Sequence, residues 1–523
     1  MIKIRQIKVS ILKDTKEELI NKISKKLNIK EFDIKNIKIS KKSIDARTKE
    51  NIYYVYEVII DVNNENKIKL SNDVIKYKEE RYSYKITGIK NMKERPVIVG
   101  SGPSGLFLGY MLSICGYNPI IIERGEKIED RIKTVDKFFK EGILNKNSNI
   151  QFGEGGAGTF SDGKLNTLVK DKREEKVFEI FTKFGAPKEI LYEAKPHIGT
   201  DILREVIKNM RNKMIEYGCT FKYNSTLTDI NIKDNEVKSI IINNKEEIPC
   251  ETLVLGIGHS ARDTFKMLYE KGIKMVSKPF AVGIRIQHPK DLINEAMYGK
   301  YFKYLPTSSY KLTYKAKDSR GVYSFCMCPG GFVVNSSSDE KGIVINGMSN
   351  YKRDEKNSNS ALIVTVDEND YGKGLFDGMN FQKQIEEKAY KIGKGKIPTQ
   401  NYIDLKNNKE SKELLNEPSF KGSYTLSNIN EILPDYICND LIEAIEYFNT
   451  KIKGYNNDNA IISAPETRTS SPVRILRDEN YQTNIKGIYP IGEGSGYSGG
   501  ITTSAMDGIR CFEKIISIYK LDK

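Results

Sequence analysis

Apolar and polar positions change their spacing along the chain, and each change predicts a different kind of element. Over 2–11 and again over 53–62, apolar side chains alternate with polar ones, which predicts β-strands. Thr15 and Glu18 form a capping-box pattern ahead of apolar residues at helical spacing, which predicts a helix. We therefore expect residues 1–90 to form a small α+β domain that serves packing, assembly or contact with a partner.

After residue 90, the pattern changes to short, uninterrupted apolar runs, which are typical of strands buried in a parallel sheet. These runs lie at 96–99, 119–122, 253–255 and 488–491. The first two flank an apolar helical stretch at 107–114, so together they form a β–turn–α–β unit. We expect residues 91–275 and 455–523 to build one α/β domain covered by helices.

The middle of the chain, residues 276–454, has a third pattern. Longer runs with polar alternation predict strands of a more exposed sheet, and helical spacing returns near 381–392 and 440–448. We expect this segment to be a separate α+β lobe, inserted into the α/β domain, that covers a substrate.

A glycine-rich turn in the order G-x-G-x-x-G follows the run at 96–99 and opens the apolar helix. It consists of Gly100, Ser101, Gly102, Pro103, Ser104 and Gly105. Such glycines permit a tight turn, close approach of a pyrophosphate and close helix–strand packing, while the helix N-terminus attracts phosphate. Glu123 ends the next apolar run, where a carboxylate can take a ribose diol. The unit predicts a Rossmann-like nucleotide-binding domain and leaves NAD and FAD open.

Three further glycine-rich segments favour a flavin. The loop 151–164 suits close approach to a flat polar ring, although a flexible surface loop would have the same composition. The run at 252–255 ends in a Gly-x-Gly turn, which also fits an ordinary strand end. In 487–508, a second helix N-terminus would stabilise negative charge on a reduced flavin. The residues assigned to the cofactor in these segments are Gly158, Thr159, Asp162, Gly163, Lys164, Gly256, Gly258, Gly492, Glu493, Gly499, Gly500 and Ile501.

Composition and charge say more about the cellular location and the class of partner than about the reaction. The 84 basic and 69 acidic residues give a net charge of +15, but they are interleaved and do not favour nucleic acid as a partner. Seven widely spaced cysteines and an N-terminus broken by charges argue against disulfides and a signal peptide, so we expect a cytoplasmic protein. Three isolated histidines predict no metal site, and no apolar run reaches the roughly 18 residues of a membrane span.

Six motifs together resemble the uncharacterised FAD-dependent dehydrogenase family of bacteria, within the glutathione-reductase-type flavoprotein superfamily. They read GSGPSGLFLGYML, FGEGGAGTFSDGKLNT, GIGHSARDTF, FCMCPGG, APETRTSSPVRI and GEGSGYSGGITTSAMDG. The resemblance implies FAD, a two-lobed core and an oxidoreductase with an unknown substrate. By analogy, the first glycine turn and Glu123 would carry the ADP half of FAD, with Arg124 and Arg131 near the adenosine or pyrophosphate. Leu227 is assigned to the cofactor as well.

Two features of the NAD(P)H-dependent members of that superfamily are absent from the sequence. No second complete G-x-G-x-x-G unit occurs between 165 and 490, and no C-x-x-x-x-C disulfide motif follows the first turn. Because both features are absent, NAD(P)H stays open as the electron donor. A separate difference is that Glu493 stands where many relatives have Asp.

Candidate catalytic residues are Arg468, Glu466 and Cys328, which come from two segments beside the flavin motifs. Arg468 could meet an anionic substrate or the flavin, or it could form structural salt bridges. Cys326 and Cys328 share one face of a predicted strand, either as a dithiol that exchanges electrons or as packing.

The expected function is hydride transfer between FAD and a small organic substrate, in a pocket between the FAD domain and the inserted lobe. Two alternatives stay open. The first is a flavin-dependent enzyme that modifies tRNA, and the second is a non-catalytic flavoprotein in which FAD only holds the fold.

Overall fold

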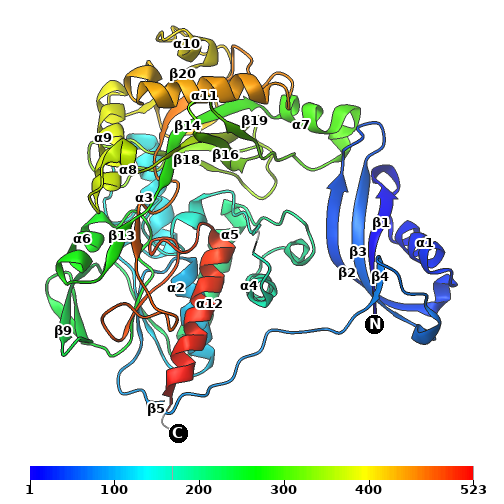
Figure 1. The fold of residues 1–523 in the computed structure, drawn as a ribbon, viewed down its shortest axis with the longest axis horizontal. Coiled ribbons are helices and arrows are strands. Elements are labelled where there is room, and N and C mark those ends of the chain that lie inside the picture. Colours follow the sequence, from blue (N-terminus) through cyan, green and yellow to red (C-terminus); the bar gives the residue numbers. More distant parts are fainter. Residues whose placement is uncertain (168, 522–523) are drawn as a thin grey trace.

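The N-terminal part of the chain forms a four-stranded antiparallel sheet with one helix against it (Figure 1). The computed structural model describes residues 1–167 and 169–521. In spatial order this sheet contains β2 (Ile34–Asp45), β3 (Tyr53–Val62), β1 (Ile2–Ser10) and β4 (Val74–Lys76). The helix α1 (Lys16–Leu27) begins where expected, because the Thr15 hydroxyl accepts a hydrogen bond from the Glu18 N–H (3.2 Å).

The N-terminal sheet stands beside the rest of the molecule and is joined to it by an extended segment (Figure 1). Its edge strand β2 also touches the body through backbone hydrogen bonds. The Lys42 N–H donates to the Tyr192 carbonyl (2.7 Å), and the Lys42 carbonyl accepts from the Ala194 N–H (2.9 Å). The small sheet is therefore docked on the body as well as tethered to it.

A five-stranded parallel sheet lies at the centre of the next part. Its order is β25 (Ile488–Pro490), β12 (Leu253–Leu255), β6 (Val97–Val99), β7 (Ile120–Ile122) and β8 (Thr220–Lys222). One face shares an apolar cluster with α2 (Pro103–Ile114), α4 (Lys172–Lys183), α5 (Thr200–Glu216) and α12 (Ile501–Ile518). The other face packs against β9 (Leu227–Lys233), β10 (Glu236–Ile242), β11 (Glu246–Pro249) and α6 (Arg262–Glu270). The short apolar runs are thus buried on both faces, as their composition requires.

Between β12 and β25 in the sequence lies a lobe built on a seven-stranded sheet. Its order is β15 (Thr313–Lys315), β16 (Gly321–Cys328), β19 (Asn357–Val366), β14 (Phe280–Pro289), β23 (Ile461–Glu466), β20 (Ile397–Asn401) and β22 (Tyr424–Leu426). The helices α9 (Asp377–Ile392) and α11 (Asp435–Phe448) bury apolar side chains in its core. A smaller sheet beside it contains β18 (Ile345–Met348), β17 (Phe332–Asn335) and β21 (Phe420–Lys421).

The remaining described helices and strands connect these parts. They are β5 (Lys90–Asn91), α3 (Ile128–Glu141), β13 (Met275–Ser277), α7 (Lys290–Tyr298), α8 (Glu368–Tyr371), α10 (Tyr402–Lys406), β24 (Val473–Ile475) and β26 (Tyr519–Lys520). Among the described residues, no helix is both long and apolar enough to cross a bilayer.

The predicted mixed α/β class is confirmed, and the structure contains a large multi-stranded sheet. In the middle segment, β18 begins at Ile345, after a turn at 339–341. The proposed domain limits at 90, 275 and 454 stay predictions.

Close packing of α12 on α2 depends on one glycine. A Cβ built on Gly508 would lie 2.2 Å from the Ser104 carbonyl oxygen, which belongs to the backbone of α2. We expect Gly508→Ala to lower the free energy of unfolding by about 1–3 kcal/mol, because the two helices must move apart. Urea denaturation measures the change.

Gly321→Ala is the matched control, because a Cβ there would have Thr365 at 3.6 Å, an ordinary van der Waals distance. Equal stability of the two variants would contradict the close approach of the two helices.

Candidate functional site

A cavity of about 430 Å³ lies between the carboxyl ends of the parallel strands and the lobe. Its walls come from the turns after β6, β7, β12 and β25, from the loop 151–164, and from the facing edge of the lobe. The lobe contributes Phe325, Cys326, Asn346, Glu466, Arg468 and Thr469. The volume is in the range of ligand pockets, and the place is where open α/β sheets bind ligands.

The first glycine turn shapes one end of the cavity. Gly100 has a φ of +99°, and a Cβ there would lie 2.1 Å from the Gly256 carbonyl oxygen. A Cβ on Gly105 would meet the Gly100 carbonyl at 2.0 Å, so this glycine allows the turn and helix to pack. Gly102 is different, because its only neighbour within 4 Å would be the Gly156 Cα at 3.9 Å. Gly102 therefore leaves open space on the cavity side.

Glu123 lines the cavity, but its carboxylate already accepts four hydrogen bonds. Ser101 donates from its backbone N–H (3.0 Å) and its hydroxyl (2.7 Å). The backbone N–H groups of Gly125 (2.9 Å) and Gly153 (3.0 Å) donate to the other oxygen. A carboxylate offers about four acceptor sites. Glu123 therefore joins three loops, and it could bind a ribose only by giving up one of these bonds.

The two arginines expected near the adenosine or pyrophosphate lie in different places. Arg124 lines the cavity, donates to Asp263 (2.9 Å) and Thr264 (3.0 Å), and lies over the Phe152 ring. Arg131 does not line the cavity.

Arg131 instead lies fully buried behind the glycine-rich loop. Its guanidinium donates to the backbone carbonyls of Asn149, Ile150, Glu154 and Gly156 at 2.7–3.0 Å. A side chain on Gly153 would collide with it, since a Cβ there would lie 2.3 Å from the Arg131 Cδ. Arg131 therefore holds the shape of the loop without touching the cavity.

The loop 151–164 brings a buried ion pair to the cavity wall. Asp162 pairs with Arg353, whose Nε donates at 2.9 Å, and the Lys164 Nζ lies 4.0 Å from the same carboxylate. Thr159 is buried in this loop but does not line the cavity. Sequence reasoning missed Arg353, because 191 residues separate it from Asp162.

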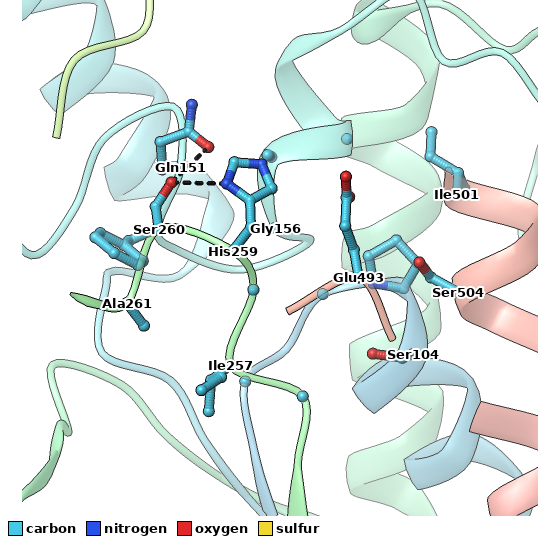
Figure 2. A pocket seen from close by; sticks show the side chains of 18 of the residues that line it. Ser104, Gln151, Gly156, Ile257, His259, Ser260, Ala261, Glu493, Ile501 and Ser504 are labelled. Carbon is cyan, nitrogen blue, oxygen red and sulfur yellow. Dashed lines mark hydrogen bonds between the residues drawn. The ribbon is translucent and has the colours of Figure 1, made fainter. Parts of the chain in front are cut away.

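His259 follows the Gly256–Gly258 turn and lines the cavity. Figure 2 shows it beside Ser260 and Gln151, with its Nδ1 3.0 Å from the Ser260 hydroxyl. Burial, together with the charges of Arg468 and Arg262, lowers the pKa of His259 to about 4. The imidazole is therefore neutral at pH 7.

The C-terminal glycine segment lines the cavity from the side opposite His259. Glu493 extends toward the cavity between Gly156 and Ile501 (Figure 2). Burial raises its pKa to about 7, although Lys278 opposes the shift. Gly492 does not line the cavity; its φ is +77°, and its N–H donates to Asp507 (2.8 Å). Asp507, which also pairs with Arg477, is a further residue that the sequence analysis missed.

Glu466 lies at the lobe side of the cavity in a fully buried ion pair with Arg285. The Arg285 Nε donates to one Glu466 oxygen at 2.7 Å and Nη2 to the other at 3.3 Å. Burial raises the pKa of Glu466 to about 7, and the charge of Arg285 opposes this rise. Arg285 was not predicted, because nothing in its strand sequence distinguishes it from a surface arginine.

Arg468 lines the cavity, but its N–H groups donate hydrogen bonds to a cluster of charged and polar residues. It donates to both Glu386 oxygens (3.0 and 2.9 Å), to Ser338 (2.5 Å) and to Asp339 (2.5 Å). Arg262 shares Asp339 (2.9 Å) and Glu386 (3.1 Å). Although burial raises it, the two arginines lower the pKa of Glu386 to about 2.

Most of the predicted site residues line this one cavity. Those that do are Gly100, Gly102, Pro103, Ser104, Glu123, Arg124, Gly158, Asp162, Gly163, Lys164, Leu227, Gly256, Gly258, Glu493, Gly499, Gly500, Ile501, Glu466 and Arg468. Those that lie behind the wall are Ser101, Gly105, Arg131, Thr159, Gly492 and Cys328. Cys326 lines the cavity in place of Cys328, since the strand carries a bulge here. No group of His, Cys, Asp or Glu suited to a metal ion occurs in the described part of the chain.

Comparison with known sequences identifies the family. Residues 279–469 match the family described as "FAD-dependent protein, C-terminal domain-like", and residues 1–61 match a domain of unknown function. A protein of Clostridium beijerinckii, described as an uncharacterized protein, is 45% identical over 533 residues, with 100% of both chains covered. The chain belongs to one family with this full-length relative, and its residues 279–469 belong to the C-terminal domain family of FAD-dependent proteins. The predicted FAD cofactor is thus confirmed, whereas the link to the glutathione-reductase type stays a prediction.

Several solved flavoenzymes are distantly similar to this FAD-dependent protein. L-proline dehydrogenase from P. horikoshii is 14% identical, with a TM-score of 0.36, over 81% of this chain and 94% of its own. A flavin-dependent brominase is 15% identical, with a TM-score of 0.38, over 81% and 79%. Glycerol-3-phosphate dehydrogenase from Bacillus halodurans, complexed with FAD, is 9% identical, with a TM-score of 0.35, over 82% and 66%. At this level of similarity, none of them decides the activity.

The cavity offers backbone N–H donors and open space, both of which are needed to bind FAD. The N-caps of α2 and α12 are Gly102 and Gly500, and neither helix start has a side-chain cap. The first N–H groups of a helix have no partner within it, so they can bind phosphate or the polar edge of a ring. Both helix starts line the same cavity, and the space beside Gly102 is open.

The charge cluster around Glu386 predicts that replacing this residue lowers stability by an amount that depends on pH. Glu386→Gln should lower the free energy of unfolding by about 3–5 kcal/mol at pH 7, because it leaves buried arginine charge unpaired. The pKa of Glu386 is lower in the folded protein than its ordinary 4.5, so its ionisation stabilises the fold fully above pH 4.5. The difference from wild type should shrink as the pH falls from 4.5 toward 2.

Urea denaturation at several pH values measures this difference. Glu387→Gln is the control, since Glu387 is a partly exposed neighbour on α9 that pairs with Lys383 at 3.7 Å, and it should change stability by less than about 0.5 kcal/mol. A penalty for Glu386→Gln that stays constant down to pH 3 would contradict the assigned ionisation.

Proposed function

We propose that this protein is an FAD-dependent oxidoreductase that acts on a small organic substrate between its parallel sheet and its lobe. The observation that carries the proposal is the continuity of the cavity. Gly102 at the start of α2, Gly500 at the start of α12, and Glu466 of the lobe all line it. A cofactor that extends from the first turn to the second helix would therefore have its far end against the lobe.

The residues of the parallel-sheet part would bind and orient FAD. The start of α2 would hold the pyrophosphate, and Arg124 and Leu227 would border the adenosine. The loop 151–164 and the start of α12 would border the flavin ring. Bound FAD supplies hydride and two-electron transfer to an organic substrate.

Two carboxyl groups are suited to hold or release a proton in this cavity. Burial raises the pKa values of Glu466 and Glu493 to about 7, so each exchanges protons near neutral pH. Both oxygens of Glu466 accept from Arg285, whereas the Glu493 carboxylate projects into the cavity. Glu493 is therefore the better placed of the two to exchange a proton with a bound molecule.

We do not propose that Arg468 binds an anionic substrate. Its donors are taken by Glu386, Asp339 and Ser338, so it serves to hold the cavity wall. Asn346 and Lys164 line the cavity near the lobe and are better placed to meet polar groups of a substrate. NAD(P)H as the electron donor and a cytoplasmic location remain part of the proposal.

Replacement of Gly102 separates cofactor binding from folding. In Gly102→Val, the new side chain has room in the fold, since a Cβ would have only one neighbour, at 3.9 Å, but it projects into the cavity. We expect FAD affinity to fall by about a hundredfold or more, which corresponds to about 2.7 kcal/mol. Fluorescence titration with FAD measures the affinity, and thermal unfolding of the cofactor-free protein should be unchanged.

Gly321→Ala, on β16 of the lobe, is the control and should bind FAD like wild type. If Gly102→Val bound FAD as tightly as wild type does, the pyrophosphate would not lie beside Gly102.

Anaerobic absorbance titration of the holoprotein with NADH and NADPH tests the donor. We expect the flavin band to bleach with one of the two, because a nicotinamide that reaches the flavin end of the cavity can deliver two electrons. Photoreduction of the same sample is the control that the flavin is reducible. Bleaching by light but by neither nicotinamide would exclude this donor class, while a flavin that nothing reduces would favour a structural role.

A further inference from the structure

Two cysteines meet at the lobe side of the cavity. Cys326 and Cys328 lie near the end of β16, where a bulge interrupts the pairing with β19 after Phe325. Cys326 has a φ of +41°, in the left-handed region, and it lines the cavity. Cys328 is fully buried behind it, and its thiol lies 3.4 Å from the Cys326 carbonyl oxygen. One cysteine thus borders the cavity, and the second, two residues further along the chain, is buried with its thiol against the backbone of the first.

The surroundings favour a negative charge on one sulfur. The Arg285 guanidinium donates to the Cys326 carbonyl at 3.2 Å and lies 4.0 Å from the Cys328 Sγ. A hydrogen bond from Cys328, together with the charges of Arg285 and Lys164, lowers the pKa of Cys326 to about 5 despite its burial. The same hydrogen bond and burial raise the pKa of Cys328 well above its ordinary value. The pair therefore holds one thiolate and one thiol at pH 7.

The other five cysteines lack these features. Burial raises the pKa of Cys219, Cys250 and Cys438 to about 12 and that of Cys511 as well. Cys115 is half-buried away from the cavity, and burial raises its pKa too. Cys326 is thus the cysteine at which a thiolate and a ligand cavity coincide. Thiolates are the reactive form of cysteine.

We propose that Cys326 and Cys328 act as a redox-active dithiol that exchanges two electrons with FAD bound in the same cavity. This inference rests on the proposed function and deepens it. On oxidation, a bond forms between the two sulfurs, and the pair gives up two electrons and the one proton that Cys328 carried. FAD takes up the same two electrons and that proton, so charge and atoms balance.

The chain geometry permits this bond. Residues two apart on a strand have Cα atoms about 6.6 Å apart, and disulfides span about 4.4–6.8 Å. That span already falls within the range, and the bulge and the left-handed Cys326 bend the chain between the two cysteines, which shortens it further.

The pair also points to a class of substrate. Because Cys326 borders the cavity, a low-molecular-weight disulfide or thiol can exchange with it through a mixed disulfide. In the reducing direction, the Cys326 thiolate attacks one sulfur of the disulfide and releases the other half as a thiolate. Cys328 then displaces the remaining half by forming the bond with Cys326, and electrons from reduced FAD reopen that bond.

An anaerobic reductive titration of the air-oxidised holoprotein with dithionite tests the proposal. Wild type should take up twice as many electrons per FAD as Cys326→Ser and Cys328→Ser, because the disulfide adds a second two-electron acceptor. Cys115→Ser and Cys438→Ser are controls and should match wild type. Equal uptake by wild type and Cys328→Ser would overturn the proposal.

Mass spectrometry of the cysteine-containing peptides gives a readout that does not depend on FAD. The peptide with Cys326 and Cys328 should lack two hydrogens in the oxidised protein and regain them with dithiothreitol. In Cys328→Ser, incubation with oxidised glutathione should trap a mixed disulfide on Cys326. A pair found reduced in air-oxidised holoprotein, with no mixed disulfide in the variant, would overturn the dithiol and leave the FAD assignment intact. A protein without bound FAD would instead contradict the proposed function.

The pH dependence of alkylation separates a reactive thiolate from a packed thiol. Iodoacetamide should modify Cys326 of the dithiothreitol-reduced protein with a midpoint near pH 5, and Cys328→Ala should raise this midpoint because it removes the hydrogen bond from the second thiol. Lys164→Met should raise it as well. A midpoint near the ordinary value of a thiol, unchanged in both variants, would contradict the proposal.

Discussion

The cavity depends on a buried cluster of two arginines and two carboxylates that joins the parallel-sheet part to the lobe. Arg262 begins α6 on one side, while Glu386 of α9 and Arg468 after β23 belong to the other. Asp339 is partly exposed, but Arg468 and Glu386 are almost fully buried, and charges this far from water are stable only when they are paired and hydrogen-bonded. Because Arg262 and Arg468 share the same two carboxylates, neither part can shift without leaving charge unpaired. The position of the lobe over the Gly256 turn is therefore set by electrostatics as well as by apolar packing.

Close backbone approach is the second constraint on the site. Gly100, Gly105 and Gly256 allow the turns after β6 and β12 to touch, and Arg131 fastens four carbonyls of the facing loop. Glu123 connects that loop to the first turn through its bonds with Ser101 and Gly153. The result is a preformed cavity whose wall is held by Arg131 from behind and by Glu123 at the lining itself. Such support from behind keeps binding residues in place before a ligand arrives.

The sequence predicted the parts of the site that local chemistry determines. The turn at 100–105, the loop 151–164 and the second helix start at Ile501 could each be recognised because glycine spacing next to an apolar run has a direct backbone meaning. Arg285 and Glu386 could not be recognised, since their partners lie 181 and 82 residues away and only the folded sheet brings them together. That Cys326 rather than Cys328 borders the cavity could not be recognised for a similar reason. A bulge depends on pairing with β19, which a single strand sequence does not reveal.

The distribution of charge at the lobe end of the cavity fits a redox site better than a passive binding site. A negative charge that arises there during electron transfer is costly unless nearby groups compensate it. The start of α12 and Lys164 supply fixed positive potential, whereas Glu493 can take up a proton near pH 7. A site that only held FAD for stability would not need a carboxyl group that titrates near neutrality, because a permanently ionised or neutral side chain would cost less. The raised pKa values of Glu493 and Glu466 and the lowered pKa of Cys326 therefore fit the proposed coupling of proton and electron transfer in the cavity.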